Sequence, residues 1–322
     1  MTAHRPPSDV IVLGAGMVGI GSALALQARG HAVTLFEADT RLGGHTHTHA
    51  VEMAGRAYAV DTGFIVFNPQ HYPLLSGLFE SLDVASQPTT MSFSVHSERS
   101  GLEYNATSLD TLFCQRRNLA SPRFWGMLRD LARFYREAPA LLEGDATGPT
   151  LGDWLQAGGY GDAFRDEHLV PMASALWSSP PQGILAFPAR YLVQFMANHH
   201  MLTLGTRPPW RVVAGGSATY VEALRRRWRV QERLSSPVLA VRRDADGVEL
   251  DTLRGGERFD QVVLACHSDQ ALALLGNQAS AEETAVLGAI RYQPNHAVLH
   301  TDTAVLPQHK QAWAAWNYER SP

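Results

Sequence analysis

A glycine-rich turn near the N-terminus has the spacing of a dinucleotide-binding fingerprint. Gly14-x-Gly16-x-x-Gly19 follows directly after the short apolar run 10–13. Gly14 allows the tight turn, Gly16 lets the backbone approach a pyrophosphate, and Gly19 lets a helix pack closely on a strand. The amino end of that helix offers free N–H groups and a positive dipole end to phosphates. The spacing therefore predicts phosphate binding at residues 14–19.

An acidic residue completes this pattern. Apolar positions 23, 24 and 26 predict a helix that ends at Gly30, and residues 32–36 form a second apolar strand that ends in Glu37. A carboxylate there can accept hydrogen bonds from a ribose hydroxyl, and it disfavours the 2′-phosphate of NADP. The succession of strand, turn, helix, strand and acid predicts a Rossmann-like α/β fold.

A second glycine motif follows the acid, with Arg41 before the doublet Gly43-Gly44 and His45 after it. Two glycines permit close backbone approach, and an arginine adds a fork of N–H donors for phosphate oxygens. The run E-x-x-x-R-x-G-G resembles the second glycine motif of the flavin-containing amine oxidase superfamily. That group includes monoamine oxidases, phytoene-type desaturases and protoporphyrinogen oxidases. The resemblance implies FAD as the cofactor, with Arg41 and the doublet against its pyrophosphate and ribityl chain.

Other stretches resemble a bacterial subfamily of predicted FAD/NAD-binding proteins, in which histidine replaces the arginine that usually follows the doublet. They are Asp61-Thr62-Gly63-Phe64 and residues 101–113, 174–181 and 210–221. The subfamily resemblance implies oxidation of an apolar substrate, with a lipid-modification association for some members. The superfamily resemblance also implies that the backbone of Val238 holds the adenine.

The predicted cofactor-binding residues lie in the two glycine motifs, around the acid, in the turn at residues 61–64 and at Val238. They are Gly14, Ala15, Gly16, Met17, Val18, Gly19, Glu37, Ala38, Arg41, Gly43, Gly44, His45, Thr62, Gly63 and Val238. No catalytic residue is assigned, and no metal is expected. His45, His47 and His49 would share one face of a strand, as metal ligands do, but no cysteine or carboxylate cluster joins them.

The predicted fold class is α/β, with two discontinuous domains. Residues 1–65 and 205–285 are expected to form a Rossmann-like FAD-binding domain of the glutathione-reductase type, with a parallel sheet and a β-meander. Residues 66–204 and 286–322 are expected to form an α+β substrate domain. Hairpin turns are predicted at residues 54–56 and at Asp246-Gly247, and a strand at 295–301. No final segment matches the one that passes the flavin ring in the superfamily, so we expect a C-terminally truncated chain that retains FAD poorly.

The composition indicates which partners and which cellular compartment to expect. The formal charge of −4 and 18% charged residues give no field that attracts nucleic acid. Two widely separated cysteines argue against disulfides and favour a reducing compartment. No apolar stretch is long enough to span a bilayer. We expect a cytoplasmic protein, with peripheral membrane contact left open by the basic run at residues 225–229.

Together these features predict an FAD-dependent oxidoreductase. It would remove a hydride from a C–C or C–N bond of a small apolar substrate, a lipid or an amine. Two alternatives stay open: a non-catalytic flavin- or nucleotide-binding module, and an NAD-dependent dehydrogenase that uses the same fingerprint. Bound yellow chromophore would separate the flavoproteins from the dehydrogenase.

Overall fold

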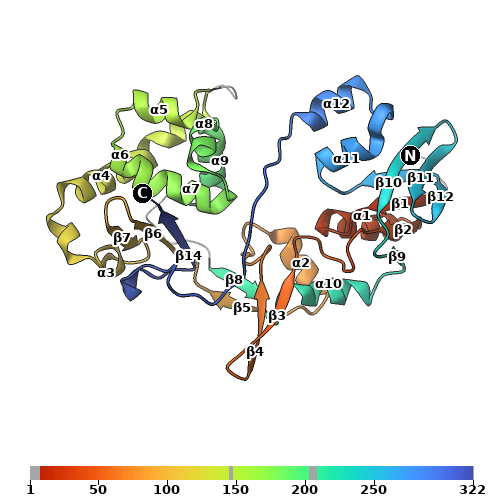
Figure 1. Ribbon diagram of the computed structural model, residues 1–322, viewed down its shortest axis with the longest axis horizontal. Coiled ribbons are helices and arrows are strands. Elements are labelled where there is room, and N and C mark those ends of the chain that lie inside the picture. The colour runs from red at the N-terminus through yellow and green to blue at the C-terminus, as the bar shows by residue number, and fades with distance from the viewer. Residues whose placement is uncertain (1–7, 145–147, 203–208, 322) are drawn as a thin grey trace. The chain divides into compact units, whose positions relative to one another are not determined.

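The computed structural model describes residues 8–144, 148–202 and 209–321 and divides into two compact units (Figure 1). Unit 1 comprises Met1–Val66, Leu74–Gln87 and Val212–His296. Unit 2 comprises Phe67–Pro73, Pro88–Arg211 and Ala297–Pro322. Both units are therefore discontinuous in sequence. The boundary expected between residues 204 and 205 lies outside the described residues.

Unit 1 is built on a parallel sheet of strand order β13-β1-β2-β9. Its strands are β1 (Asp9–Leu13), β2 (Ala32–Phe36), β9 (Gln231–Arg233) and β13 (Gln261–Leu264). Helix α1 (Met17–Ala28) joins β1 to β2. Residues 10–13 are almost completely buried, and burial on both faces explains why β1 is apolar throughout instead of alternating.

An antiparallel meander lies beside this sheet (Figure 1). It consists of β10 (Val238–Asp244), β11 (Gly247–Thr252) and β12 (Gly255–Phe259). The Phe36 ring of β2 meets the Phe259 ring edge-on, with 6.2 Å between centroids. Ile11 and Leu250 complete the apolar layer between sheet and meander. The predicted α/β fold is thus confirmed. The hairpin predicted at Asp246-Gly247 turns one residue earlier, at Ala245 and Asp246, and Gly247 begins β11.

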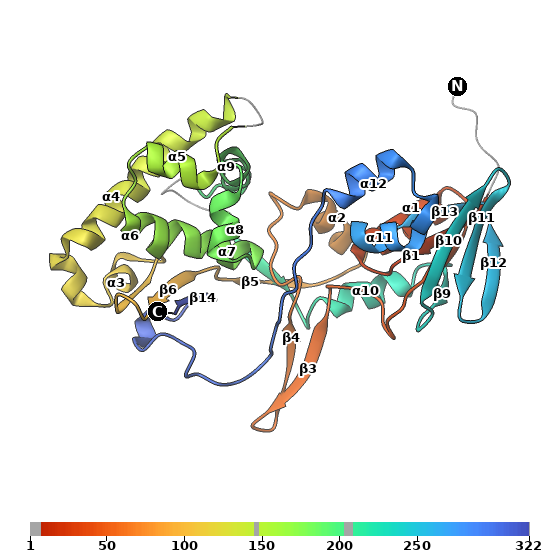
Figure 2. The same cartoon turned by 45° about the horizontal axis from the view of Figure 1, so that its top comes forward.

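The remaining elements of unit 1 surround this core. They are the antiparallel hairpin β3 (Thr48–Met53) and β4 (Arg56–Asp61), and the helices α2 (Pro73–Ser81), α10 (Ala218–Arg225), α11 (Ser268–Leu275) and α12 (Ala281–Gly288). The hairpin turns at residues 54–55, as predicted, and Figure 2 shows it projecting as a separate ribbon. The short strands β5 (Ser86–Thr89) and β8 (Trp210–Val213) pair with each other, and the division between the units falls within both.

Unit 2 combines a small sheet with a helical bundle. The sheet has the order β14-β6-β7, from β6 (Phe93–Ser97), β7 (Leu102–Asn105) and β14 (Trp316–Arg320). The helices include α3 (Leu109–Leu112), α4 (Pro122–Glu137), α5 (Leu151–Ala157), α6 (Asp162–Phe164), α7 (Val170–Trp177), α8 (Pro181–Ala186) and α9 (Ala189–Asn198). Ser121 caps α4 by accepting the N–H of Phe124, the arrangement that Ser-Pro at a helix start predicts.

The prediction of a strand at residues 295–301 is wrong. These residues are exposed and have no regular structure, and no described strand pairs with them. A short apolar run is not sufficient, because a strand also needs a neighbour for its N–H and C=O groups. The last strand of the chain is β14, which pairs in parallel with β6. Within the described part of the chain, no helix is both long and apolar enough to cross a bilayer.

Candidate functional site

Two glycines of the fingerprint are required by the fold of unit 1. Gly14 has a φ of +100°, and a Cβ atom there would lie 2.7 Å from the carbonyl oxygen of Ala265. A Cβ atom on Gly19 would lie 1.9 Å from the carbonyl oxygen of Gly14. Neither position can therefore accept a side chain without moving the backbone. These contacts hold α1 tightly against the carboxyl ends of β1 and β13.

Gly16 differs, because a Cβ atom there would meet nothing within 4 Å. Its φ of −68° and ψ of 176° suit any amino acid. Gly16 is the N-cap of α1, and no described side chain caps this helix end. The N–H groups of its first turn are therefore available to an anion. The fold gives no reason for glycine at position 16, whereas a pyrophosphate in this open space gives one.

The second glycine motif packs directly against the first. The N–H of Gly43 donates to the carbonyl oxygen of Ala15 at 2.8 Å. Gly44 has a φ of +56°, and a Cβ atom there would lie 2.9 Å from the Cα of Gly16. The two motifs therefore form one continuous glycine wall at the amino end of α1, where backbone can approach a dinucleotide closely.

Arg41 stabilises this wall through hydrogen bonds to backbone carbonyl groups of the same loop. Its guanidinium donates to the carbonyl oxygens of Gly44 at 2.7 Å and Thr46 at 3.2 Å, and lies 3.4 Å from the carboxylate of Asp39. These bonds fix the loop that carries the glycine doublet. Contact between Arg41 and a phosphate stays a prediction, and such a contact would share or replace the bonds to the loop.

Glu37 lies across from the first glycine loop, as its position at the end of β2 predicts. One carboxylate oxygen accepts the N–H of Ala15 at 2.7 Å, and the other accepts the N–H of Asp39 at 2.9 Å. A carboxylate oxygen has two acceptor positions, so Glu37 retains capacity for a ribose hydroxyl. Ala38 follows it in the same turn.

Glu37→Ala is expected to weaken FAD binding by about 1.5–3 kcal/mol, the range for a hydrogen bond to a charged group. The loss combines the predicted ribose contact with the support of the Ala15 amide. Fluorescence titration with FAD measures it. Glu52→Ala, which removes an exposed carboxylate from β3, is the matched control and should bind FAD normally. An unchanged affinity in Glu37→Ala would remove Glu37 from the site.

A polar network beside the glycine wall could not be found from the sequence. The Asp61 carboxylate accepts the N–H of Ser217 at 2.9 Å and its hydroxyl at 2.7 Å. It also accepts the hydroxyl of Thr48 at 2.5 Å, and the Thr48 oxygen accepts the N–H of Ala218 at 2.8 Å. The network ties the end of β4 to the start of α10, although Asp61 and Ser217 are 156 residues apart. In the sequence, only the glycines near Asp61 and near Ser217 indicated that two backbone segments could come close together.

The two remaining loop residues of the predicted site follow Asp61 directly. The N–H of Thr62 donates to the carbonyl oxygen of His47 at 3.2 Å. A Cβ atom on Gly63 would lie 1.9 Å from the carbonyl oxygen of His45. Thr62 and Gly63 are therefore brought against the loop of the second glycine motif. Their contact with the cofactor stays a prediction.

The alternating histidines do not share one face. His47 and His49 lie together, with 3.9 Å between ring centroids, whereas the ring of His45 stacks on that of His267 at 5.8 Å. The strand β3 begins only at Thr48, so the alternation that would align the three rings is not present. Burial, Arg41 and His49 lower the pKa of His47. In the described ranges, no three histidine, cysteine, aspartate or glutamate side chains are placed to hold a metal ion.

Val238 and the basic run at residues 225–229 also lie in unit 1. Val238 begins β10, and the pairing with β11 shifts between Val238 and Ala240. A contact of its backbone with adenine stays a prediction. Arg225 forms an ion pair with Glu232 at 2.6 Å, and Arg227 donates to the carbonyl oxygen of Ser81. Two arginines of the run are thus held by unit 1 itself.

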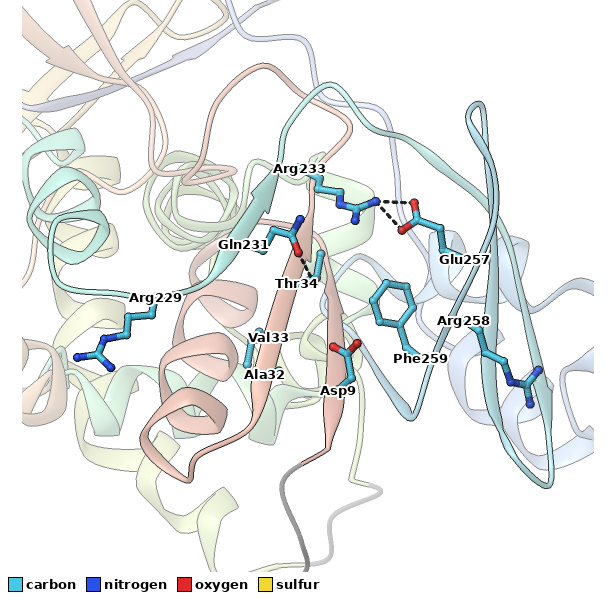
Figure 3. A pocket seen from close by; sticks show the side chains of 10 residues that line it. All are labelled: Asp9, Ala32, Val33, Thr34, Arg229, Gln231, Arg233, Glu257, Arg258 and Phe259. Atoms are coloured by element: carbon cyan, nitrogen blue, oxygen red, sulfur yellow. Dashed lines mark hydrogen bonds and ion pairs between the residues drawn. The ribbon is translucent and has the colours of Figure 1, made fainter.

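A cavity of about 510 Å³ in unit 1 lies apart from the glycine wall (Figure 3). It is lined by Asp9 and Ala32, the first residues of β1 and β2, whereas the glycine loop follows the last residue of β1. Two arginines that line it are paired, Arg233 with Glu257 and Arg258 with Asp244, each at 2.5 Å. Dinucleotides bind at the carboxyl ends of parallel strands, so this cavity is not the cofactor site.

Comparison with known proteins adds a family match. The family model for flavin containing amine oxidoreductases matches residues 17–313. The carotenoid phi-ring synthase of Chlorobaculum tepidum is 38% identical over 86 residues, which are 27% of this chain and 13% of the synthase. The L-amino-acid oxidase of Bungarus fasciatus is 47% identical over 49 residues, 15% of this chain and 10% of the oxidase.

A solved structure extends the likeness to the fold. Cyclohexylamine oxidase from Brevibacterium oxydans superposes with a TM-score of 0.66 at 23% identity, covering 88% of this chain and 63% of the oxidase. The two proteins therefore share one fold. The chain spans less than two thirds of the length of this oxidase and a smaller part of the two curated relatives.

Proposed function

The chain belongs to the family of flavin containing amine oxidoreductases, with FAD as its cofactor, and we propose that it oxidises a small apolar amine or lipid. One observation carries the proposal. The two glycine motifs close into a single wall, 2.9 Å from a Gly44 Cβ position to the Cα of Gly16, while the space in front of Gly16 stays open. An uncapped helix end and a carboxylate face the same loop.

In this proposal the residues of unit 1 bind and orient the cofactor. The N–H groups at the start of α1 hold the pyrophosphate, Glu37 holds a ribose, and Gly43 and Gly44 let the backbone approach. FAD, when bound, supplies the hydride acceptor, and the protein supplies orientation and electrostatics. Hydride removal from a C–N or C–C bond is the expected reaction.

The names of the relatives support this range of substrates. A carotenoid phi-ring synthase, an L-amino-acid oxidase and a cyclohexylamine oxidase together include a lipid-type substrate and two amine-type substrates. Carotenoids and the ring of cyclohexylamine are both hydrocarbon. The substrate class proposed for this chain is therefore apolar, with a C–N or C–C bond to oxidise.

An anaerobic absorbance titration tests the proposal. The chain, with FAD added to saturation, should bind the yellow chromophore, and candidate amines or lipids should bleach it when they reduce the flavin. Absence of flavin, with binding of NAD instead, would favour the dehydrogenase. Bound flavin that no candidate bleaches would favour a non-catalytic flavin-binding module and contradict the proposed oxidation.

A further inference from the structure

Unit 2 contains a cluster of imidazole rings that the proposed function does not use. The ring of His71 lies 5.3 Å from that of His199 and 5.2 Å from that of His200, measured between centroids. The ring of Trp210 lies 6.4 Å from His71. His199 is the C-cap of α9 and His200 follows it, and His71 lies on the segment Phe67–Pro73. We call His71, His199 and His200 the histidine cluster.

The hydrogen bonds of His71 determine which ring nitrogen carries the proton. The Oδ1 of buried Asn68 accepts the backbone N–H of His71, so its Nδ2–H group is the donor to Nδ1 of the His71 ring, each at 2.9 Å. In the neutral ring the proton must then sit on Nε2. This Nε2 atom is buried and has no hydrogen-bond partner among the residues that the structure describes. A buried donor without an acceptor is costly, so the position favours an acceptor atom from a ligand.

The described side chains that hydrogen-bond the rings of the cluster are neutral. Its neighbours on the segment Phe67–Pro73 are the neutral side chains of Asn68 and Gln70, and Gln70 bonds His200 at 3.0 Å. Strand β8 contributes the ring of Trp210. Burial, His199 and His200 lower the pKa of His71. An anion placed at the cluster would reverse this effect, because a negative charge favours the protonated imidazole.

An aromatic stripe leads to the cluster. Tyr191 and Phe195 of α9 and its C-cap His199 are spaced four residues apart, so they lie on one side of the helix. Phe195 stacks on His199 at 4.1 Å, and Trp177 lies 4.9 Å from Phe195 and 6.2 Å from Tyr191. Tyr191 is 58% exposed. The stripe of Trp177, Tyr191 and Phe195 thus offers apolar surface next to imidazole N–H donors.

We propose that the histidine cluster and the aromatic stripe bind an amphiphilic carboxylate, with its anionic head at His71 and His199 and its apolar chain along Trp177, Tyr191 and Phe195. The His71 Nε2–H group donates to a carboxylate oxygen, and an imidazole of the cluster takes up a proton as the anion binds. The inference deepens the proposed function, on which it rests for its role: it names carboxylates with an apolar chain as the substrate class.

Calorimetry on the FAD-saturated 322-residue chain, without oxygen, tests the binding. Decanoate is compared with decan-1-ol, which has the chain without the charge, and with acetate, which has the charge without the chain. Decanoate is expected to bind at least about tenfold more tightly than either. Titration at pH 7 in two buffers of different ionisation enthalpy should show proton uptake on decanoate binding, and affinity should fall from pH 6 to pH 8. No saturable decanoate binding, equal binding of decan-1-ol, or binding without proton uptake overturns the proposal.

Substitutions of single histidines test which residues bind decanoate. His71→Gln and His199→Gln should each weaken decanoate binding at least about tenfold and reduce the proton uptake. His296→Gln replaces an exposed histidine outside the cluster and should bind as the wild type does. If His71→Gln does not fold, as circular dichroism would show, His199→Gln decides the matter. Equal affinity of His199→Gln and wild type contradicts the assignment.

The result is separable from the proposed oxidation, because binding is measured without turnover. The flavin absorbance of the same samples reports on reduction. Decanoate that binds through the cluster in a protein whose flavin no substrate bleaches would refute the oxidation and retain the carboxylate site. Flavin reduction by an amine, without decanoate binding, would refute the carboxylate site and retain the proposed oxidation.

Discussion

Gly16→Val is expected to abolish FAD binding while the protein still folds. The Cβ position of Gly16 has no neighbour within 4 Å, and its backbone angles suit a branched residue. The added methyl groups would occupy the space in front of the α1 N–H groups, where the pyrophosphate is expected. FAD affinity should fall at least about a hundredfold, or about 2.7 kcal/mol. Fluorescence titration and the absorbance of the purified protein measure the loss.

A matched substitution on the same helix separates this effect from helix propensity. Gly21 also has open space at its Cβ position and lies five residues further along α1, so Gly21→Val should fold and bind FAD. Gly19→Val should fail to fold, because its side chain would collide with the Gly14 carbonyl. Stoichiometric FAD in purified Gly16→Val would show that the glycine wall is not the cofactor site.

Glu103→Ala is expected to destabilise unit 2 by about 3 kcal/mol, since a buried carboxylate that several donors share is costly to remove. The side chain of Glu103 is almost completely buried. It accepts the N–H of Gln308 at 2.7 Å, the N–H of His309 at 2.9 Å and the His309 ring at 2.5 Å. His96 lies 3.6 Å from the other side of the carboxylate. These bonds hold the segment before β14 against β7, so the variant should also become sensitive to proteolysis there.

The stability that Glu103 contributes should depend on pH. Burial raises the pKa of Glu103, but the hydrogen bonds from His309 and Gln308, together with His96, outweigh it and hold the pKa below its usual value of 4.5. A group whose pKa is lower in the folded state stabilises the fold above the unfolded pKa. The contribution is therefore complete at neutral pH and is lost as the pH falls below about 4.5 towards the folded pKa.

Urea unfolding between pH 3 and pH 7 measures this dependence. The stability difference between wild type and Glu103→Gln should be largest at neutral pH and shrink towards pH 3, because Gln mimics the protonated acid. Glu98→Ala removes an exposed carboxylate of unit 2 and should change the free energy of unfolding by less than about 0.5 kcal/mol. A difference between wild type and Glu103→Gln that does not change with pH would contradict the assigned role.

Local rules were enough to predict the elements proposed to bind the cofactor. The fingerprint glycines, the acid at the end of β2 and the hairpin turn before Gly247 each depend on residues a few positions apart. Backbone sterics and apolar periodicity act at that range, and the helices that begin at Ser121 and Thr150 follow from side-chain caps of the same kind. The parallel sheet with its meander followed from the order of these elements.

Contacts between distant segments were decided by tertiary packing. Asp61 meets Ser217 across 156 residues, His45 stacks on His267 instead of aligning with His47, and His71 joins His199 at the end of α9. The apolar residues at 295–301 predicted a strand, yet they have no neighbouring strand in the described structure. A residue's type states which partners it can accept, but which partner comes within hydrogen-bond distance depends on how the elements pack, and that information is not local in the chain.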